Sequence, residues 1–101
     1  MRIISKAPLR DFWARHPSAE MPLKHWYRVV KAAKWSSFAD TRKTFNTADT
    51  YTKGNKMYVI FNVAGNKYRI IAAINYSIRT VFVGWVLTHA EYSRNKWKDF
   101  L

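Results

Sequence analysis

The strongest constraint on the fold is a change in hydrophobic period at Met57, after which apolar side chains recur at every second residue. Three strand-like runs follow at residues 57–63, 67–76 and 80–87, with the turn sequence AGN between the first two. Such alternation, broken by short turns, is typical of antiparallel strands joined by hairpins. The second and third runs are apolar on both faces at their centres, which predicts interior strands covered by helices on at least one side.

The first third of the chain shows a helical period instead. Ser5 is a predicted N-cap for one helix, which Pro17 ends, and Ser18 is a predicted N-cap for a second helix. Their apolar residues recur as expected for one helical face: Leu9, Phe12, Trp13 and His16 in the first, and Leu23, Trp26, Tyr27 and Val30 in the second. Two such helices joined by a turn predict an antiparallel helical hairpin packed on the sheet.

The remaining segments complete the predicted order of elements. MRII at the start predicts a short strand, and residues 36–56, rich in Ser, Thr, Asn and Asp, predict a loop with at most one helical turn. Thr88 and Glu91 have the spacing of a capping box, which predicts a C-terminal helix reaching Trp97. The sequence therefore predicts one α+β domain over residues 1–101, a small antiparallel sheet packed by the N-terminal helical hairpin, in the order βααβββα.

Charge narrows the class of partner. The chain has 18 Lys and Arg residues against 6 Asp and Glu, a formal net charge of +12. Such an excess favours a polyanion, with nucleic acid first and an anionic membrane surface or acidic protein as alternatives. The absence of cysteine and of an apolar leader or membrane-length apolar stretch predicts a cytoplasmic protein that does not span a membrane.

Several kinds of chemistry lack their sequence patterns. The three glycines are isolated, so no phosphate-binding loop is present, and the three histidines and six acidic residues show no metal-ligand spacing. No nucleophile-elbow pattern occurs either. We therefore expect no cofactor and no metal, and the remaining cations, histidines and tyrosines suit RNA cleavage by attack of a 2′-hydroxyl on its own phosphate.

Individual residues allow two interpretations each. Lys67 and Arg69 share one face of their strand and could grip a phosphate, or they could be solubilising residues at an exposed strand end. His89 could be catalytic or a surface residue of the helix start. His16 is interpreted as structural because it completes an apolar stripe. Trp13, Trp26 and Trp85 are expected in the core, whereas Trp35 and Trp97 are freer to stack on bases.

Two segments resemble a known family. FNVAGNKYRIIAAINY at residues 61–76 and VLTHAEY at 86–92 are similar to the HigB toxins of bacterial toxin-antitoxin modules, which are relatives of the RelE-like toxins. Residues 9–35 and 38–49 also resemble the N-terminal half of this family, so that the resemblance extends over nearly the whole chain.

The resemblance implies a RelE-like fold and an activity. HigB-family toxins are mRNA interferases, metal-independent endoribonucleases that halt translation, usually by cutting mRNA in the ribosomal A site. The implied partners are mRNA, the ribosome and a HigA-type helix-turn-helix antitoxin, which neutralises the toxin and carries the complex to operator DNA, where it represses their shared operon.

The resemblance also assigns residues. Lys67 and Arg69 become phosphate or transition-state ligands, and His89 and Tyr92 become candidates for proton transfer or RNA positioning. Further RNA contacts are expected from Lys24, His25, Arg28 and Arg79. Gly84 and Ser93 depart from the family pattern, which more often has a basic residue and an aspartate at these positions, and Arg79 is a candidate replacement for the missing cation.

Two other functions remain open at this level. A non-catalytic RNA or ribosome binder could block translation by occupancy alone. A gyrase inhibitor of the ParE type would share the fold, but its motifs are not the ones in this chain.

Overall fold

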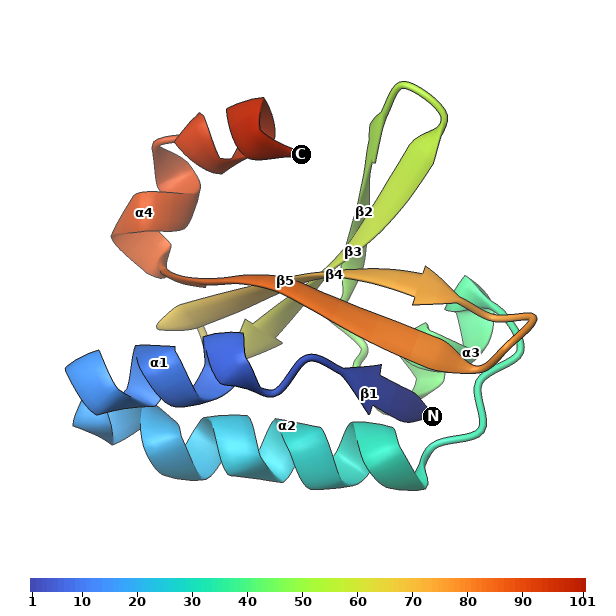
Figure 1. The fold of residues 1–101 in the computed structure, drawn as a ribbon, viewed down its shortest axis with the longest axis horizontal. Coiled ribbons are helices and arrows are strands. Elements are labelled where there is room, and N and C mark those ends of the chain that lie inside the picture. The colour runs from blue at the N-terminus through green and yellow to red at the C-terminus, as the bar shows by residue number, and fades with distance from the viewer.

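A five-stranded sheet forms the centre of the computed structural model, which describes residues 1–101 (Figure 1). The strand order is β1-β5-β4-β3-β2, and the strands are β1 (Arg2–Ile4), β2 (Asp49–Lys53), β3 (Lys56–Val63), β4 (Tyr68–Asn75) and β5 (Thr80–Thr88). Neighbouring strands run antiparallel except β1, which pairs in parallel with β5. The sheet is therefore mixed, and the prediction of an antiparallel sheet is wrong at this edge, because a strand's residues do not reveal which partner it joins.

Helices cover one face of this sheet, and the C-terminal helical turn packs on part of its other face. They are α1 (Ala7–Arg15), η1 (Pro17–Ala19), α2 (Glu20–Ala32), α3 (Phe38–Thr44), α4 (His89–Ser93) and η2 (Lys96–Phe100). Figure 1 shows α1 and α2 side by side along one face of the sheet, while α4 and η2 curl back from the end of β5. None of the helices has the length and apolar character needed to cross a membrane.

The predicted helix caps have mixed outcomes. The capping box is confirmed, since Thr88 Oγ1 accepts from Glu91 N at 3.1 Å and Glu91 Oε1 accepts from Thr88 N at 2.9 Å. The caps predicted at Ser5 and Ser18 are wrong, because neither residue occupies an N-cap and no side chain caps α1 or α2. A 3-10 turn at η1 leads directly into α2, which removes the need for a side-chain cap there.

The prediction of a loop over residues 36–56 is wrong. This segment contains α3, capped by Ser37, and β2, which forms a hairpin with β3 around Gly54 at φ +61°. β2 is a polar edge strand, so its stability comes from backbone pairing with β3, and it has no buried face to impose an apolar alternation. The observed order is therefore βαααββββα.

Both faces of the sheet are packed, although unequally. The larger core lies between α1, α2 and the sheet, and in it the Trp26 ring lies 5.3 Å from the Phe61 ring at an interplanar angle of 71°. On the opposite face, Trp97 from η2 covers Ile60 and Ile71. These two layers explain why the centre of β4 is apolar on both faces.

A β-bulge at Gly84 changes which side chains are buried. Ile71 pairs with Trp85, but the next residue, Ala72, pairs with Val83, so Gly84 is an extra residue in β5. The bulge turns Trp85 to the face opposite α1 and α2. There it is 39% exposed, contrary to its predicted place in the core. Trp35 and Trp97, predicted to be freer, are buried.

Candidate active site

The end of β5 and the start of β4 bring the two family-like segments together. Lys67 lies in the turn just before β4, and Arg69 pairs with Leu87 of β5. The backbone N–H of His89, the first residue of α4, donates to the carbonyl of Lys67 at 2.8 Å. Residues 67–69 and 88–92 therefore form one surface, although about twenty residues separate them in the chain.

Arg69 is the buried centre of this surface. Its side chain is only 6% exposed, and Nη1 donates to the carbonyls of Asn66 at 3.1 Å and Tyr68 at 3.2 Å. Nη2 donates to Asn66 Oδ1 and lies 3.4 Å from His89 Nδ1. The guanidinium also lies 5.1 Å from the centre of the Tyr92 ring. Arg69 therefore fixes the β3–β4 turn, His89 and Tyr92 relative to one another.

The charge of Arg69 has no acidic partner. The fold contains two ion pairs, Lys24 with Glu20 and Lys43 with Asp40, and neither is at this site. A guanidinium removed from water loses hydration, and neutral carbonyls return only part of that free energy. The uncompensated positive charge at the base of the surface therefore favours binding of an anion.

The contact with Arg69 favours one tautomer of His89. A guanidinium can only donate hydrogen bonds, so the 3.4 Å contact is a hydrogen bond only when His89 Nδ1 carries a lone pair. The ring proton of a neutral His89 then lies on Nε2. Because His89 is exposed, this Nε2–H is available as a donor to a bound phosphate.

Tyr92 is held from below by η2. Its ring stacks on Trp97 with centroids 5.4 Å apart and an interplanar angle of 14°, and its carbonyl accepts from Trp97 Nε1 at 3.0 Å. Trp97, predicted to be free for base stacking, therefore supports the site from inside.

An open cleft of about 760 Å³ lies beside Lys67 and His89, and neither Arg69 nor Tyr92 is among the residues that line it. Its lining includes Lys67 and His89, together with His16 and Asn66, which sequence reasoning did not assign to the site. His16 stacks on Phe12 at 4.4 Å, as expected of a structural residue, and also forms one wall of the cleft. Asn66 could have been found from its place in the GNKYR segment; His16 could not, because α1 is remote in sequence from β4. No three His, Cys, Asp or Glu side chains gather in the fold.

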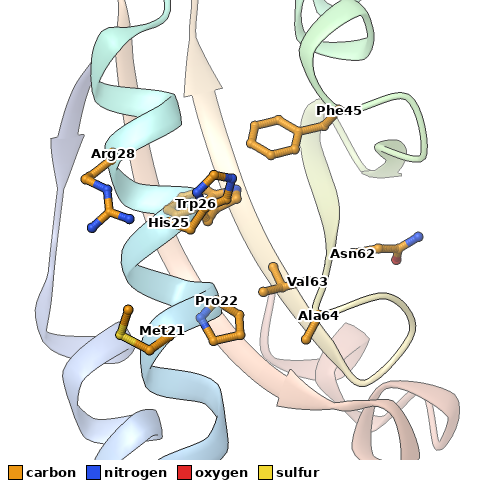
Figure 2. A pocket seen from close by; sticks show the side chains of 9 residues that line it. All are labelled: Met21, Pro22, His25, Trp26, Arg28, Phe45, Asn62, Val63 and Ala64. Carbon is orange, nitrogen blue, oxygen red and sulfur yellow. The ribbon is translucent and has the colours of Figure 1, made fainter.

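The other sequence-predicted RNA contacts lie elsewhere. Lys24 and Arg28 line a separate basic hollow of about 330 Å³ between α1 and α2, with Lys6, Lys31 and two aromatic rings. His25 and Arg28 border a third pocket, shown in Figure 2. Arg79 lies in the turn before β5, about 30 Å from the far end of that strand at roughly 3.3 Å per residue. It therefore does not join Arg69 as a replacement cation.

Comparison with known proteins identifies the family of this chain. The profile of the HigB toxin family, the RelE-like toxic component of a toxin-antitoxin system, matches residues 19–95. A protein of Escherichia coli O6:H1 named mRNA interferase HigB is 37% identical over 94 residues, which cover 93% of this chain and 90% of the relative. The mRNA interferase toxin HigB of Escherichia coli K12 is 25% identical over 91% of this chain and 88% of its own length. A family match that includes both the GNKYR and THAEY segments, together with a relative at this identity, establishes that the chain belongs to the HigB toxin family.

Proposed function

We propose that this chain is the toxin of a bacterial toxin-antitoxin module and acts as an mRNA endoribonuclease that inhibits translation. The names of its relatives support this reaction class. The observation that carries the proposal is Arg69, a buried cation without an acidic partner. It contacts His89, which lines an open cleft together with Lys67.

The residues in and beside this cleft suit cleavage through the RNA's own 2′-hydroxyl, without a metal. The 2′-oxygen loses its proton and bonds to the adjacent phosphorus, and the bond from phosphorus to the 5′-oxygen of the next nucleotide breaks as that oxygen gains a proton. Lys67 and Arg69 stabilise the extra negative charge on the phosphorane, and His89 donates from Nε2 to a phosphate oxygen. Tyr92 is the remaining candidate for positioning RNA or moving a proton.

The proposed setting is a ribosome in the cytoplasm. The basic hollow that contains Lys24 and Arg28 lies apart from the cleft, and His25 and Arg79 add further positive or polar surface. Separate cationic surfaces suit a substrate mRNA presented within a larger RNA assembly. The proposed protein partner is a HigA-type helix-turn-helix antitoxin, which would also carry the complex to operator DNA.

Primer extension on a defined mRNA in a reconstituted translation reaction tests this function. The purified protein is added with ribosomes present or omitted, and discrete new 5′ ends are expected only during translation. The ends should be a 2′,3′-cyclic phosphate and a 5′-hydroxyl, whereas metal-assisted water attack would leave a 5′- or 3′-phosphate without a cyclic product. Intact mRNA in an arrested reaction would replace cleavage with inhibition by occupancy.

A further inference from the structure

An apolar groove separate from the cleft lies between α2 and the end of β3. Met21, Pro22 and Trp26 form its α2 side, Val63 and Ala64 its β3 side, and Phe45 closes one end (Figure 2). We call this the α2–β3 groove; its volume is about 480 Å³ and most of its lining is apolar. His25 and Arg28 extend from α2 at its border, so the groove combines an apolar floor with a basic rim.

The β3 side of the groove is an unpaired sheet edge. β2 pairs with β3 only as far as Asp49 opposite Ile60. Backbone groups point alternately to the two sides of a strand, so Asn62 directs its N–H and C=O to the same side as Ile60, beyond the end of β2. The backbone of Asn62 forms no hydrogen bond to a turn, loop or helix cap. Its side chain points away from the groove (Figure 2). One donor and one acceptor are therefore free at this edge.

One residue that lines the groove, Trp26, carries a buried donor without an acceptor. Trp26 is 1% exposed, and its Nε1–H has no hydrogen-bond partner. The two other buried indole N–H groups have acceptors: Trp35 donates to Thr44 Oγ1 and Trp97 to the carbonyl of Tyr92, each at 3.0 Å. An unpaired buried N–H destabilises the unliganded fold, so binding that repacks Trp26 onto an acceptor would be favoured.

These features together select a peptide as the occupant. A free donor and acceptor on one sheet edge match the backbone of an extended peptide, and the apolar floor matches one of its side chains. RNA offers no such backbone pattern and little apolar surface for the floor. Arg28 and the net charge of +12 favour a carboxylate on the same segment.

We propose that the α2–β3 groove binds an extended acidic segment of the antitoxin, which pairs with Asn62, inserts an apolar side chain and places a carboxylate at Arg28. The identity of this partner rests on the proposed function, whereas the peptide chemistry rests on the groove. Because the groove and the cleft both include Ala64, a segment bound here would lie at the border of the catalytic surface.

A matched pair of substitutions tests the location. Met21 is 66% exposed in the groove, and Met57 is 43% exposed at the far end of β3, outside it. Met21→Glu should weaken binding of the purified cognate antitoxin by at least about tenfold in calorimetry, and Met57→Glu by less than about twofold. Asn62→Pro, which removes the free N–H, should weaken binding similarly. Unchanged affinity in both groove variants, with native circular dichroism, would overturn the proposal.

The indole N–H signals provide an independent measurement. On addition of antitoxin to the ¹⁵N-labelled toxin, the Trp26 signal should shift downfield, while those of Trp35 and Trp97 stay nearly unchanged because their acceptors are internal. A shift caused by a non-cleavable RNA oligonucleotide, but not by antitoxin, would assign the groove to RNA and refute the peptide. Both experiments measure binding of the antitoxin, so their results do not depend on whether the protein cleaves mRNA.

Discussion

Replacing Arg69 with methionine separates its charge from its volume. Methionine fills a similar space without any charge or donor. If Arg69 serves mainly to attract and stabilise a phosphate, Arg69→Met should abolish most cleavage while the protein stays folded. Arg79→Met, the same substitution in the exposed turn before β5, is the matched control.

The expected magnitude follows from the contacts of Arg69. The bond to the Tyr68 carbonyl is buried, and its loss costs about 1–3 kcal/mol, whereas Asn66 is exposed and can bond to water instead. Loss of the contact with the Tyr92 ring adds about 1 kcal/mol. Removal of a desolvated cation without a counter-ion returns several kcal/mol. The free energy of unfolding should therefore change by less than about 2 kcal/mol, while cleavage falls about 10²- to 10³-fold.

Chemical denaturation and the translation assay measure the two effects. Sulfate supplies a third readout, because an anion that binds the folded state raises the melting temperature with the logarithm of its concentration once it exceeds the dissociation constant. Wild type and Arg79→Met should gain more from sulfate than Arg69→Met. A destabilisation of 3–5 kcal/mol, roughly that of breaking a buried ion pair, would show that Arg69 is structural and refute this reasoning.

Three further predictions concern other parts of the fold. Lys67→Met should lower cleavage about tenfold or more and reduce the salt dependence of RNA binding, as measured by titration at several ionic strengths, whereas a Lys67→Arg variant should retain activity. Thr88→Ala should lower the free energy of unfolding by about 1 kcal/mol in chemical denaturation. It should also lower cleavage, because the cap holds the helix that carries His89. Burial raises the pKa of Tyr76, so folding favours its neutral form and stability should fall as pH rises above about 10. Tyr76→Phe, which loses a 2.9 Å bond to buried Thr41, should cost about 1 kcal/mol at pH 7 and show a smaller decline at high pH.

The bulge at Gly84 gives a physical reason for a glycine at this position. A Cβ placed on Gly84 would lie 3.2 Å from the carbonyl of Ile71, tighter than an ordinary contact. Any side chain here would require the neighbouring β4 backbone to shift slightly, so the basic residue that the family resemblance led us to expect at this position does not fit without that shift. Lys67 is the exposed cation that lines the cleft.

Local patterns determined much of this protein before any coordinates. The change of period at Met57 predicted the three central strands, and the Thr88–Glu91 spacing predicted the cap that starts α4. These predictions succeed because each depends on neighbouring residues along one strand or one helical turn. β2 escaped prediction because an exposed edge strand has no apolar periodicity to reveal it.

The tertiary structure alone decided how these elements meet. The parallel pairing of β1 with β5, the rotation of Trp85 by the bulge and the burial of Trp97 beneath Tyr92 all depend on contacts between remote segments. The same holds for the candidate site. The family-like segments of the sequence pointed to Lys67, Arg69, His89 and Tyr92. The sequence could not show that Arg69 is buried without an acidic partner. Burial and charge compensation are properties of packing in three dimensions. They distinguish a buried cation that favours binding of an anion from an exposed one that only solubilises a strand end.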